Sequence, residues 1–557
     1  MCLAAIRAWL GHHQRMFHRF DGARRPSSEI RSPMLLSMPI RLPLNVLHQS
    51  TTAACATRGM HEDSYEKKEK CGVFGVWGGP EPVMTCYLGM YAQQHRGQES
   101  AGIAVSNGRR LEATTGMGLV PEIFTRPVVE ALERQARPVL LDAPGGAKSS
   151  NGSAYTHSCG AIGHNRYSTA GGSLARNAQP LLESYIGGQV AVAHNGNLIN
   201  ADALRRRFEQ AGHLFHTTSD TEVIVHLLAS PEQQKAVDPI AATLRHLEGA
   251  YSLVFLFPDR IEAARDPWGW RPLVIGKLPD GRHVVASETV ALDVVGATLI
   301  REVQPGEIVT LSDAGLSSRR FDDPAPRRAH CIFEHVYFAN PSSVVFGENV
   351  QIVRERLGEK LAMEAPVAAD YVMPMPDSGR SAATGYARAS GISYREGIVP
   401  NRYVGRTFIK PSQSERQSAV KLKLNVIKDI VAGRKLVVVD DSIVRGTTTQ
   451  VKMNQLREAG AKEIHLRISC PPIRHPCFFG VDFASRDQLI AHKKTVEEIR
   501  EFLGVDSLHY LSLEGMLSCV TTQPREHWCT ACYTGDYRLD PEHPVTDEVA
   551  TRQMSMF

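Results

Sequence analysis

The 557-residue sequence lacks several features that would assign a class of protein at once. No run of 18 uninterrupted apolar residues occurs, so we expect no transmembrane helix and no membrane partner. The formal net charge is only +4, which gives no global argument for a nucleic-acid partner. The 11 cysteines are too scattered for a disulfide-stapled secreted scaffold, which favours reduced thiols in an intracellular protein.

The length predicts two to four domains, and 43% hydrophobic with 22% charged residues is ordinary for a globular chain. Residues 1–59 differ from the rest, because they hold eight Arg, no Lys and only two acids. This composition resembles that of organellar transit peptides. The alternative is an upstream extension without a role, since Met60 offers a second start. Either way, we leave residues 1–59 out of the fold.

Short apolar runs at 71–77, 189–194 and 250–257 predict strands, and residues 201–211 carry a helical pattern. The strands follow one another closely and the helices come in groups. This order suggests packed sheets more than regular βαβ alternation.

Two segments predict irregular structure. Residues 134–158 are rich in Pro, Gly, Ala and Ser and predict a surface loop or insertion. Residues 322–328, which contain two prolines, predict a linker and the first domain boundary.

The second half carries the sharpest motif. Residues 435–440 form a β-branched run typical of a buried parallel strand, and Asp440 and Asp441 stand at its carboxyl end. Gly446-Thr447-Thr448 follow at the start of a predicted helix, and residues 463–469 predict the next strand. Backbone N–H groups and hydroxyls at a helix start suit a phosphate, and adjacent acids suit ribose hydroxyls or Mg²⁺. A solvated strand end capped by Asp is the alternative.

This string resembles the signature of type I phosphoribosyltransferases. The resemblance implies that Asp440 and Asp441 hold the ribose hydroxyls and Mg²⁺. It also implies that a loop wraps the 5′-phosphate, with Ser442, Arg445, Gly446, Thr447 and Thr448 as its contacts. Asp377-Ser378-Gly379 matches the pyrophosphate-side loop of that family, with Ser378 as a further Mg²⁺ contact.

A basic stretch separates these two motifs. From Arg402 to Lys435 it holds nine basic residues and two acids. A solvated basic face is the alternative for such a run. The family has a flexible catalytic loop here, which implies that Arg402, Arg406 and Lys410 help to bind a multiply charged substrate.

In the first half, Cys71 is followed by polar blocks at 94–98, 163–171, 194–197 and 217–220. Each block alone reads as a polar turn, but together they could converge on a pocket for a zwitterion. An Arg can hold a carboxylate and an Asp an ammonium group, while Asn195 and the Gly196 N–H could stabilise an oxyanion.

Together these blocks resemble the class II glutamine amidotransferases, which belong to the N-terminal nucleophile hydrolases. The resemblance implies that the leader or propeptide, residues 1–70, is cleaved off so that the α-amine of Cys71 becomes the base for its thiol. If translation begins at Met60, the propeptide is 60–70. The resemblance also gives Arg166 the glutamine carboxylate and Asp220 its ammonium, and it makes Asn195 and Gly196 the oxyanion hole.

Four further cysteines need an explanation. Cys529 and Cys532 form a CxxC pair, which alone indicates zinc, redox chemistry or chance. Together with Cys331 and Cys477 they resemble the iron–sulfur branch of the amidophosphoribosyltransferase family. This resemblance implies one [4Fe–4S] cluster. Spacing alone does not separate this cluster from zinc. The remaining cysteines are interpreted as core or incidental, or as part of the leader: Cys86, Cys159, Cys470, Cys519, Cys2 and Cys55.

Both signatures in this order resemble the amidophosphoribosyltransferase family. The fold implied is α/β and α+β: an N-terminal nucleophile hydrolase αββα sandwich at 71–325, a type I phosphoribosyltransferase parallel sheet at 330–510, and a C-terminal segment 511–557 with cluster ligands. The activity implied is transfer of the amide nitrogen of glutamine to phosphoribosyl pyrophosphate, giving 5-phosphoribosylamine, pyrophosphate and glutamate. This is the first step of de novo purine synthesis.

The resemblance also implies a homotetramer inhibited by purine nucleotides. We expect a cytoplasmic enzyme, with organellar targeting by residues 1–59 as the alternative. Residues 134–158 are longer than the family's usual insertion. A glucosamine-6-phosphate synthase is a rival enzyme, but the Asp440-Asp441 string argues against it. A catalytically dead sensor of phosphoribosyl pyrophosphate or oxygen is a rival of another class, and the complete set around Cys71 argues against that.

Overall fold

The computed structural model describes residues 69–137, 159–168, 174–400, 424–481 and 486–540. These residues belong to one compact unit. Most of the predicted leader, most of the predicted insertion, and Arg402, Arg406 and Lys410 lie outside the described residues.

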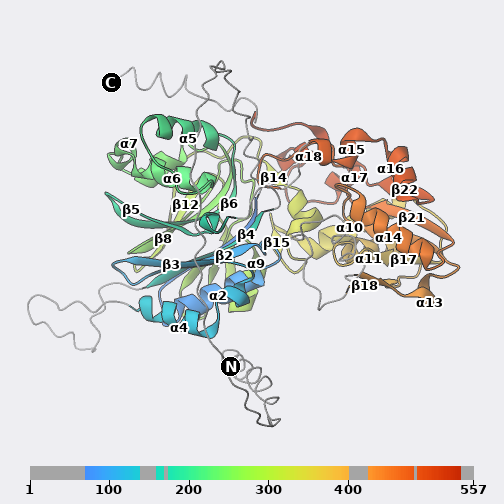
Figure 1. Cartoon of the computed structure of the whole chain (residues 1–557), viewed down its shortest axis with the longest axis horizontal. Coiled ribbons are helices and arrows are strands. Elements are labelled where there is room, and N and C mark those ends of the chain that lie inside the picture. The colour runs from blue at the N-terminus through green and yellow to red at the C-terminus, as the bar shows by residue number, and fades with distance from the viewer. Residues whose placement is uncertain (1–68, 138–158, 169–173, 401–423, 482–485, 541–557) are drawn as a thin grey trace, which may run out of the picture. The chain divides into compact units, whose positions relative to one another are not determined.

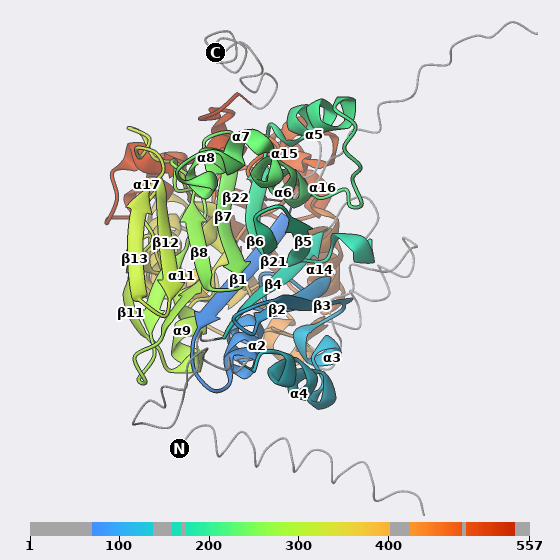
Figure 2. The same ribbon diagram turned by 90° about the vertical axis from the view of Figure 1, so that its left-hand side faces the viewer.

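The amino-terminal half, residues 69–320, contains two antiparallel sheets. Their orders are β11-β9-β10-β1-β4-β2-β3 and β13-β12-β8-β7-β6-β5. Figure 2 shows strands β13, β12, β8, β7 and β6 in this order. The first sheet contains β1 (Glu69–Trp77), β2 (Ser100–Ser106), β3 (Leu111–Met117), β4 (Gly160–Ser168), β9 (Val274–Lys277), β10 (His283–Ala286) and β11 (Thr298–Glu302). The second contains β5 (Leu181–Tyr185), β6 (Gly188–Leu198), β7 (Gly249–Phe257), β8 (Arg260–Arg265), β12 (Glu307–Ser312) and β13 (Gly315–Arg320).

Helices cover both outer faces of this pair of sheets (Figure 1). Over the first sheet lie α2 (Pro82–Ala92), α3 (Val120–Ile123), α4 (Arg126–Gln135) and α9 (Thr289–Val295). Over the second lie α5 (Ala201–Gln210), α6 (Asp220–Ala229), α7 (Pro231–Gln234) and α8 (Pro239–Leu244). A short 3₁₀ turn, η1 (Ala175–Asn177), precedes β5. The predicted αββα sandwich is therefore confirmed.

Alternation along β1 explains why its sequence reads as a continuous apolar run. Val73 and Trp77 pack into the core between the sheets, whereas Phe74 and Val76 pack beneath the helices. Side chains of a strand point alternately to its two faces, so a sheet covered on both sides needs apolar residues at every position.

The carboxy-terminal half, residues 330–540, is built on a parallel sheet in the order β17-β20-β21-β22. Its strands are β17 (Tyr371–Pro374), β20 (Lys435–Asp440), β21 (Glu463–Ile468) and β22 (Ser507–Tyr510). Its helices are α10 (Val350–Glu364), α11 (Arg380–Ser390), α13 (Lys428–Val431), α14 (Thr447–Glu458), α15 (Ile490–Lys493), α16 (Val496–Leu503), α17 (Leu513–Ser518) and α18 (Ala531–Thr534). Smaller elements are β14 (His330–Cys331), η2 (Glu334–Phe338), β15 (Val344–Val345), β16 (Glu348–Asn349), β18 (Ile398–Pro400), β19 (Leu424–Val426), η3 (Arg486–Gln488), η4 (Arg525–His527) and β23 (Trp528–Cys529). The predicted parallel-sheet fold is confirmed.

Most predicted elements agree with the structure, and the differences are local. β20 has the predicted bounds, and β21 ends one residue early at Ile468. The prediction of an irregular segment from residue 134 is wrong at its start, because α4 continues to Gln135. Burial of Val129 and Leu132 keeps this helix on the sheet. Residues 321–329 form no helix or strand, and the domain boundaries drawn from them stay predictions.

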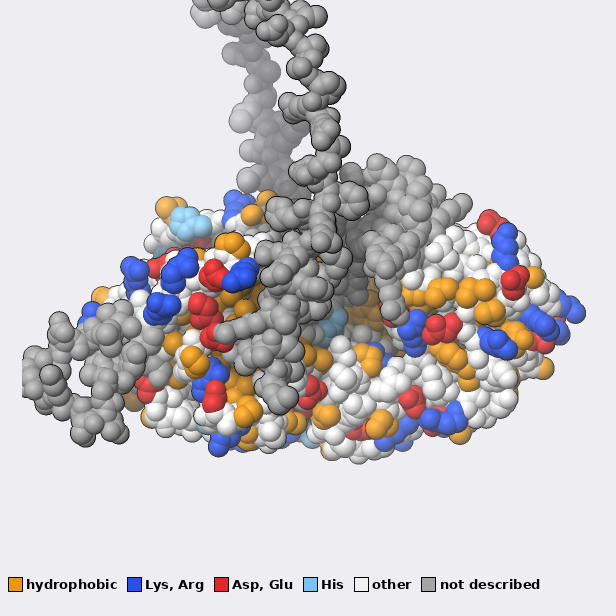
Figure 3. Space-filling view, turned by 90° about the horizontal axis from the view of Figure 1, so that it is seen from below, with side chains coloured by type: hydrophobic (Ala, Val, Ile, Leu, Met, Phe, Trp, Pro, Cys, Tyr) orange, Lys and Arg blue, Asp and Glu red, His pale blue; other side chains and the backbone are white. Residues whose placement is uncertain are grey.

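The exposed face in Figure 3 carries acidic and basic side chains interspersed over both halves, without a large patch of one sign. Among the described helices, none combines the length and the apolar character that crossing a membrane requires.

Candidate functional site

Cys71 lies near the start of β1 and is fully buried. Its position in the alternation matches that of Val73, so its side chain points toward the second sheet. Arg166 of β4 is its partner across the strands, and directly paired residues share a face of the sheet. The register therefore places the predicted glutamine-binding Arg beside the predicted nucleophile.

Asn195 of β6 approaches this region from the other sheet. It has the same alternation as Ala191 and Ala193, which line the core between the sheets. Asn195 Nδ2 donates to Ser287 Oγ at 3.3 Å, and Ser287 Oγ also accepts from the Val73 backbone N–H at 3.0 Å. Ser287 thus ties the predicted oxyanion residue to the strand that carries Cys71.

Gly196 and Asp220 lie at the end of the same strand. A Cβ atom at Gly196 would stand 1.9 Å from the Ala250 carbonyl oxygen, so only glycine fits. Asp220 opens α6, and its Oδ2 accepts from the Leu198 N–H at 3.0 Å. The structure therefore anchors Asp220 on β6, two residues beyond Gly196.

A buried histidine links β4 to β6 in this region. The nitrogen His164 Nε2 lies 2.9 Å from the His194 carbonyl oxygen. Burial lowers the pKa of His164 to about 3, so the ring is neutral at physiological pH and donates this hydrogen bond.

Arg96 belongs to the polar block 94–98, and its role is visible only in the structure. Its Nε donates to the Cys71 carbonyl oxygen at 2.8 Å. Its Nη2 pairs with Glu334 Oε1 at 2.8 Å, and its Nη1 pairs with Glu288. Both carboxylates lie about two hundred residues away in the sequence, so no local pattern could have identified them.

Glu288 shows how strongly this buried cluster is held. Burial alone would raise the pKa of Glu288, but the charges of His95 and Arg96 lower it well below its usual range. The carboxylate also accepts from the Asn340 N–H and the Ser343 hydroxyl, at 2.8 and 2.7 Å. The nucleophile strand is therefore tied to the carboxy-terminal half by fully buried ionic contacts.

The second predicted site lies at the carboxyl end of β20. Asp440 and Asp441 are both buried. Burial raises the pKa of Asp440 well above its usual range, and the charge of Asp441 adds to the effect. Asp440 Oδ1 accepts from the Asp441 N–H at 2.9 Å, and Ser378 Oγ lies 3.5 Å away. The predicted Mg²⁺ contacts are thus brought together from β20 and the loop after β17.

The start of α14 completes this edge. Gly446 has φ +76° and caps the helix, and a Cβ there would stand 2.8 Å from Ile490 Cδ1. Arg445, Thr447 and Thr448 are exposed at the helix start, and Arg445 Nη2 donates to Gln488 Oε1. Ser442 Oγ bonds Asp441 and holds the loop against the carboxylates. The arrangement offers N–H groups, hydroxyls and a cation to an anion.

Ser378 reaches Asp440 because Gly379 approaches β20 closely. A Cβ at Gly379 would stand 2.3 Å from the Val439 carbonyl oxygen, so the loop depends on glycine at this position. The three basic side chains predicted to help at this site lie outside the described residues.

The four selected cysteines come from separate segments that meet. Cys331 of β14 pairs with Cys529 of β23. Burial raises the pKa of Cys532, and the nearby thiols of Cys529, Cys477, Cys331 and Cys470 raise it further. Among the described residues, no three His, Cys, Asp or Glu side chains approach closely enough to hold a single metal ion.

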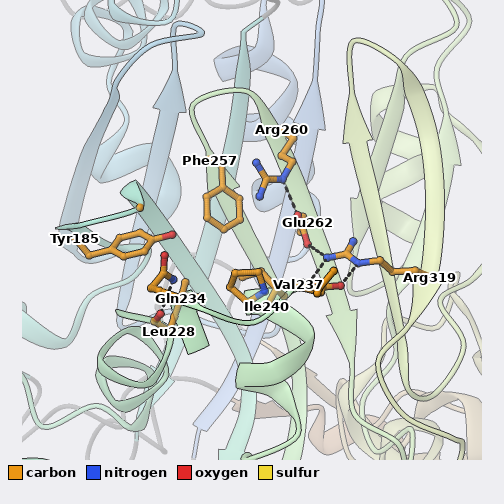
Figure 4. Close-up of a pocket in the computed structure, with 12 residues that line it drawn as sticks. Tyr185, Leu228, Gln234, Val237, Ile240, Phe257, Arg260, Glu262 and Arg319 are labelled. Atoms are coloured by element: carbon orange, nitrogen blue, oxygen red, sulfur yellow. Dashed lines mark hydrogen bonds and ion pairs between the residues drawn. The ribbon is translucent and has the colours of Figure 1, made fainter. Parts of the chain in front are cut away.

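A separate hollow of about 550 Å³ opens on the outer side of the second sheet (Figure 4). None of the predicted site residues lines it. Arg260 and Arg319 point into it, but both guanidinium groups pair with Glu262 at 2.6 Å. Because these charges are satisfied within the chain, the hollow is not part of the predicted chemistry.

Known proteins resemble the chain over most of its length. A family model described as a glutamine amidotransferase domain matches residues 164–294. The chloroplastic amidophosphoribosyltransferase of Glycine max is 44% identical over 509 residues, which cover 91% of this chain and 84% of the relative. The amidophosphoribosyltransferase of Bacillus subtilis is 45% identical over 473 residues, covering 84% and 94%.

Two solved structures agree with this result. One is described as the allosteric regulatory enzyme of purine biosynthesis; it has a TM-score of 0.74 and 44% identity, and the match covers 84% of this chain and 96% of that one. The other is the glutamine phosphoribosylpyrophosphate amidotransferase of B. subtilis in complex with ADP and GMP. It has a TM-score of 0.73 and 43% identity, and the match covers 84% and 97%.

Proposed function

Because the chain belongs to the amidophosphoribosyltransferase family, we propose that the residues described above carry out the two halves of its reaction. The enzyme transfers the amide nitrogen of glutamine to phosphoribosyl pyrophosphate, which is the first step of purine biosynthesis. The roles of individual residues given below are our proposal.

The first half-reaction releases ammonia at Cys71. Once residues 1–70 are removed, the free α-amine of Cys71 takes the proton of its thiol, since such an amine has a pKa of about 8. The thiolate attacks the amide carbon of glutamine, and the α-ammonium returns its proton to the departing nitrogen. Water then hydrolyses the thioester to glutamate and restores the thiol.

Glutamine is held by opposite charges and by the oxyanion hole. Arg166 binds its carboxylate and Asp220 its ammonium group, while Asn195 Nδ2 and the Gly196 N–H stabilise the negative oxygen of the tetrahedral intermediate. The register of Cys71 with Arg166 is the single observation that carries this proposal. Arg96 supports it by holding the Cys71 carbonyl oxygen.

The second half-reaction takes place at the carboxyl end of β20. Asp440 and Asp441 bind the ribose hydroxyls, and the start of α14 binds the 5′-phosphate through Ser442, Arg445, Gly446, Thr447 and Thr448. Ammonia attacks C1 of the ribose as the C1–O bond to pyrophosphate breaks. The product is 5-phosphoribosylamine. Arg402, Arg406 and Lys410, which lie between the two motifs in the sequence, help to bind the multiply charged substrate.

Mg²⁺ fits this site, because it prefers one or two carboxylates together with substrate phosphates. Asp440, Asp441 and Ser378 would hold it, and it would supply neutralisation of the departing pyrophosphate. Burial of both carboxyl groups at the end of β20 supports this assignment, since burial raises the pKa of Asp440 and a bound cation would stabilise its charged form.

A [4Fe–4S] cluster fits the four cysteines. The thiols of Cys529, Cys477 and Cys331 all act on the pKa of Cys532, so the four cysteines are neighbours in the fold. Four thiolates suit a zinc ion as well as a [4Fe–4S] cluster, and the resemblance to the iron–sulfur branch of the family favours the cluster. Cys331, Cys477, Cys529 and Cys532 would hold it, with a role in holding the three segments together.

Regulation, assembly and location complete the proposal. One relative is described in complex with ADP and GMP, which supports inhibition of this enzyme by purine nucleotides. A homotetramer and a cytoplasmic location remain our expectation. Organellar targeting by residues 1–59 is the alternative to a cytoplasmic location, and the plant relatives that are named chloroplastic support this alternative.

One assay tests the two half-reactions. Pyrophosphate release from phosphoribosyl pyrophosphate is measured with glutamine and, separately, with ammonium, on protein whose N-terminal mass is known. We expect a chain that begins at Cys71 to use both nitrogen sources. A chain that begins at Cys71 and uses ammonium but not glutamine would contradict the residue roles at the first site.

A further inference from the structure

A single segment, residues 469–480, runs from the edge of the parallel sheet to the amino-terminal half. At its start, the Ser469 N–H donates to the Asp440 carbonyl oxygen at 3.0 Å. Midway, the Arg474 and His475 N–H groups both donate to the Cys532 carbonyl oxygen at 3.0 Å. Three of the residues are prolines, whose rings fix φ, so the segment is stiff for its length.

Side chains of the amino-terminal half hydrogen-bond to and stack on the far end of the segment. Asn197 Nδ2 donates to the Phe478 carbonyl oxygen at 2.8 Å, and Arg271 Nη2 donates to the Phe479 carbonyl oxygen at 2.7 Å. The Phe479 ring stacks on Trp270 with ring centroids 3.9 Å apart. Two successive carbonyl groups are therefore fixed from the other half of the molecule.

The backbone of Gly480 packs closely against β6. It has φ +87°, and a Cβ there would stand 3.1 Å from the carbonyl carbon of Gly196. No other residue type fits this conformation and this approach without strain. The end of the segment thus lies against the residue proposed to supply the oxyanion N–H.

These contacts lie next to Gly196, the glycine of the proposed oxyanion hole. Asn197 follows Gly196 directly in β6, so its hydrogen bond to Phe478 limits how the Gly196 N–H can rotate. Arg271 also binds Glu334 at 3.1 Å, and Glu334 binds Arg96, which holds the Cys71 carbonyl oxygen. One buried network therefore joins the segment to both the nucleophile strand and the oxyanion strand.

We propose that residues 478–480 position the oxyanion hole for the release of ammonia, with Asn197 and Arg271 as positioning residues. The inference rests on the proposed roles of Asn195 and Gly196. Oxyanion donors act only when they are fixed in advance at the right place, so small shifts of β6 lower the rate of the chemical step. Glutamine affinity is less affected, because Arg166 binds the substrate carboxylate from β4, on the other sheet.

The first test is Asn197→Asp in the full enzyme, since a carboxylate cannot donate to the Phe478 carbonyl oxygen. We expect kcat with glutamine to fall about tenfold, with KM for glutamine within about twofold and ammonium-dependent activity unchanged. Asn200→Asp is the matched control. Asn200 makes the same kind of bond, to the His246 carbonyl oxygen at 2.9 Å, but within its own half.

The second test is Gly480→Ala, compared with Gly433→Ala. Both glycines have positive φ, but a Cβ at Gly433 meets nothing within 4 Å, so it reports backbone strain alone. We expect only Gly480→Ala to lower kcat with glutamine and to speed hydrogen exchange of the β6 amides at 194–198. The iron content and the N-terminal mass should match those of the unmodified enzyme.

The outcomes separate the inference from the function on which it rests. If Asn200→Asp and Gly433→Ala lower kcat as much as their partners do, the effects are general and the inference is wrong. If Asn197→Asp and Gly480→Ala keep full glutamine activity, the segment does not position the site. An unmodified enzyme that begins at Cys71 and cannot use glutamine would instead contradict the proposed function itself.

Discussion

The two halves of the molecule build their sites in opposite ways. In the amino-terminal half, the predicted residues come from two sheets and a helix, and they are buried between covered layers. In the carboxy-terminal half, most of the site is one string from Asp440 to Thr448 at the edge of a sheet. An assembled site depends on register and buried ion pairs, whereas a contiguous site depends mainly on one strand, its loop and one helix start.

The variant Cys71→Ala tests most directly whether the two sites work independently. We expect glutamine-dependent activity to fall by about 10⁴-fold or more, because no other group can form the thioester. Activity with ammonium should persist, since the second site is built entirely from the other half. The measurement is pyrophosphate release with each nitrogen source. Equal loss with both sources would show that the two sites are not separable.

The reciprocal change is Asp441→Asn, at the end of β20. We expect activity to fall roughly 10²–10³-fold with glutamine and with ammonium alike, because both routes need the same ribose and Mg²⁺ contacts. Asp370→Asn is the control, since Asp370 caps the opposite end of the strand by accepting from the Lys435 N–H at 2.8 Å. A loss confined to glutamine would contradict the proposed role of Asp441.

The same difference explains how much could be predicted from the sequence. The strand, loop and helix around Asp440 lie in one stretch, and β-branched residues, paired acids and a glycine turn carry the signal directly. In the amino-terminal half, alternation predicted the strands, but their pairing was not readable from spacing. The family resemblance supplied the roles of Arg166, Asn195 and Asp220, and the observed register explains how the first two can face one space.

The buried ion pairs were out of reach of any local pattern. Arg96 meets Glu334 only because the start of the carboxy-terminal half packs against β1, and Arg271 joins the same carboxylate. Charged residues are seldom buried unless they are paired, and the sequence does not show which partner will be near. The end of α4 was missed for a similar reason, because tertiary burial of Leu132 outweighs the loop-like composition that follows.

All four cysteines belong to the carboxy-terminal half, and Cys477 and Cys529 pack beside Ala250 and Trp270 of the amino-terminal half. Cys532→Ser tests whether one cluster supports the segments that carry these cysteines. We expect loss of iron and sulfide and a fall in Tm of roughly 10 °C or more, because three segments lose their common support. Cys519→Ser is the matched control, since that buried thiol donates to the Gly515 carbonyl oxygen at 3.2 Å and does not belong to the set of four. Zinc in place of iron would overturn the cluster assignment and leave the transferase assignment standing.

Arg166→Lys tests whether the assembled site depends on a two-pronged contact. An ammonium group keeps the charge but not the fork geometry that suits a carboxylate. We expect KM for glutamine to rise roughly 10–100-fold, with kcat changed less and ammonium activity unchanged. Arg126→Lys, at an exposed pair with Glu130, is the control. A fall in kcat with KM unchanged would contradict carboxylate binding by Arg166.

The smallest expected effect is on the pH dependence of stability, and it comes from Glu133 in the amino-terminal half. Glu133 of α4 accepts from the Met84 N–H at 2.8 Å, and burial raises its pKa from 4.5 to about 7. A raised folded pKa favours the protonated form, so this contribution to stability is full below about pH 4.5 and is lost as the pH rises through about 7. Ionised Glu133 therefore destabilises the fold at pH 8.

Glu133→Gln removes this charge and keeps an amide oxygen for the Met84 N–H. We expect Glu133→Gln to raise Tm more at pH 8 than at pH 5.5, relative to the unmodified enzyme. The corresponding difference in the free energy of unfolding is less than about 1 kcal/mol, because solvent screens part of the charge. Glu498→Gln is the control in the carboxy-terminal half, because the Thr495 N–H lowers the pKa of Glu498 and its effect is constant over this range. Equal shifts of Tm for Glu133→Gln at both pH values would show that Glu133 does not change its charge between pH 5.5 and 8. Glu133 would then make no pH-dependent contribution to the stability of the amino-terminal half.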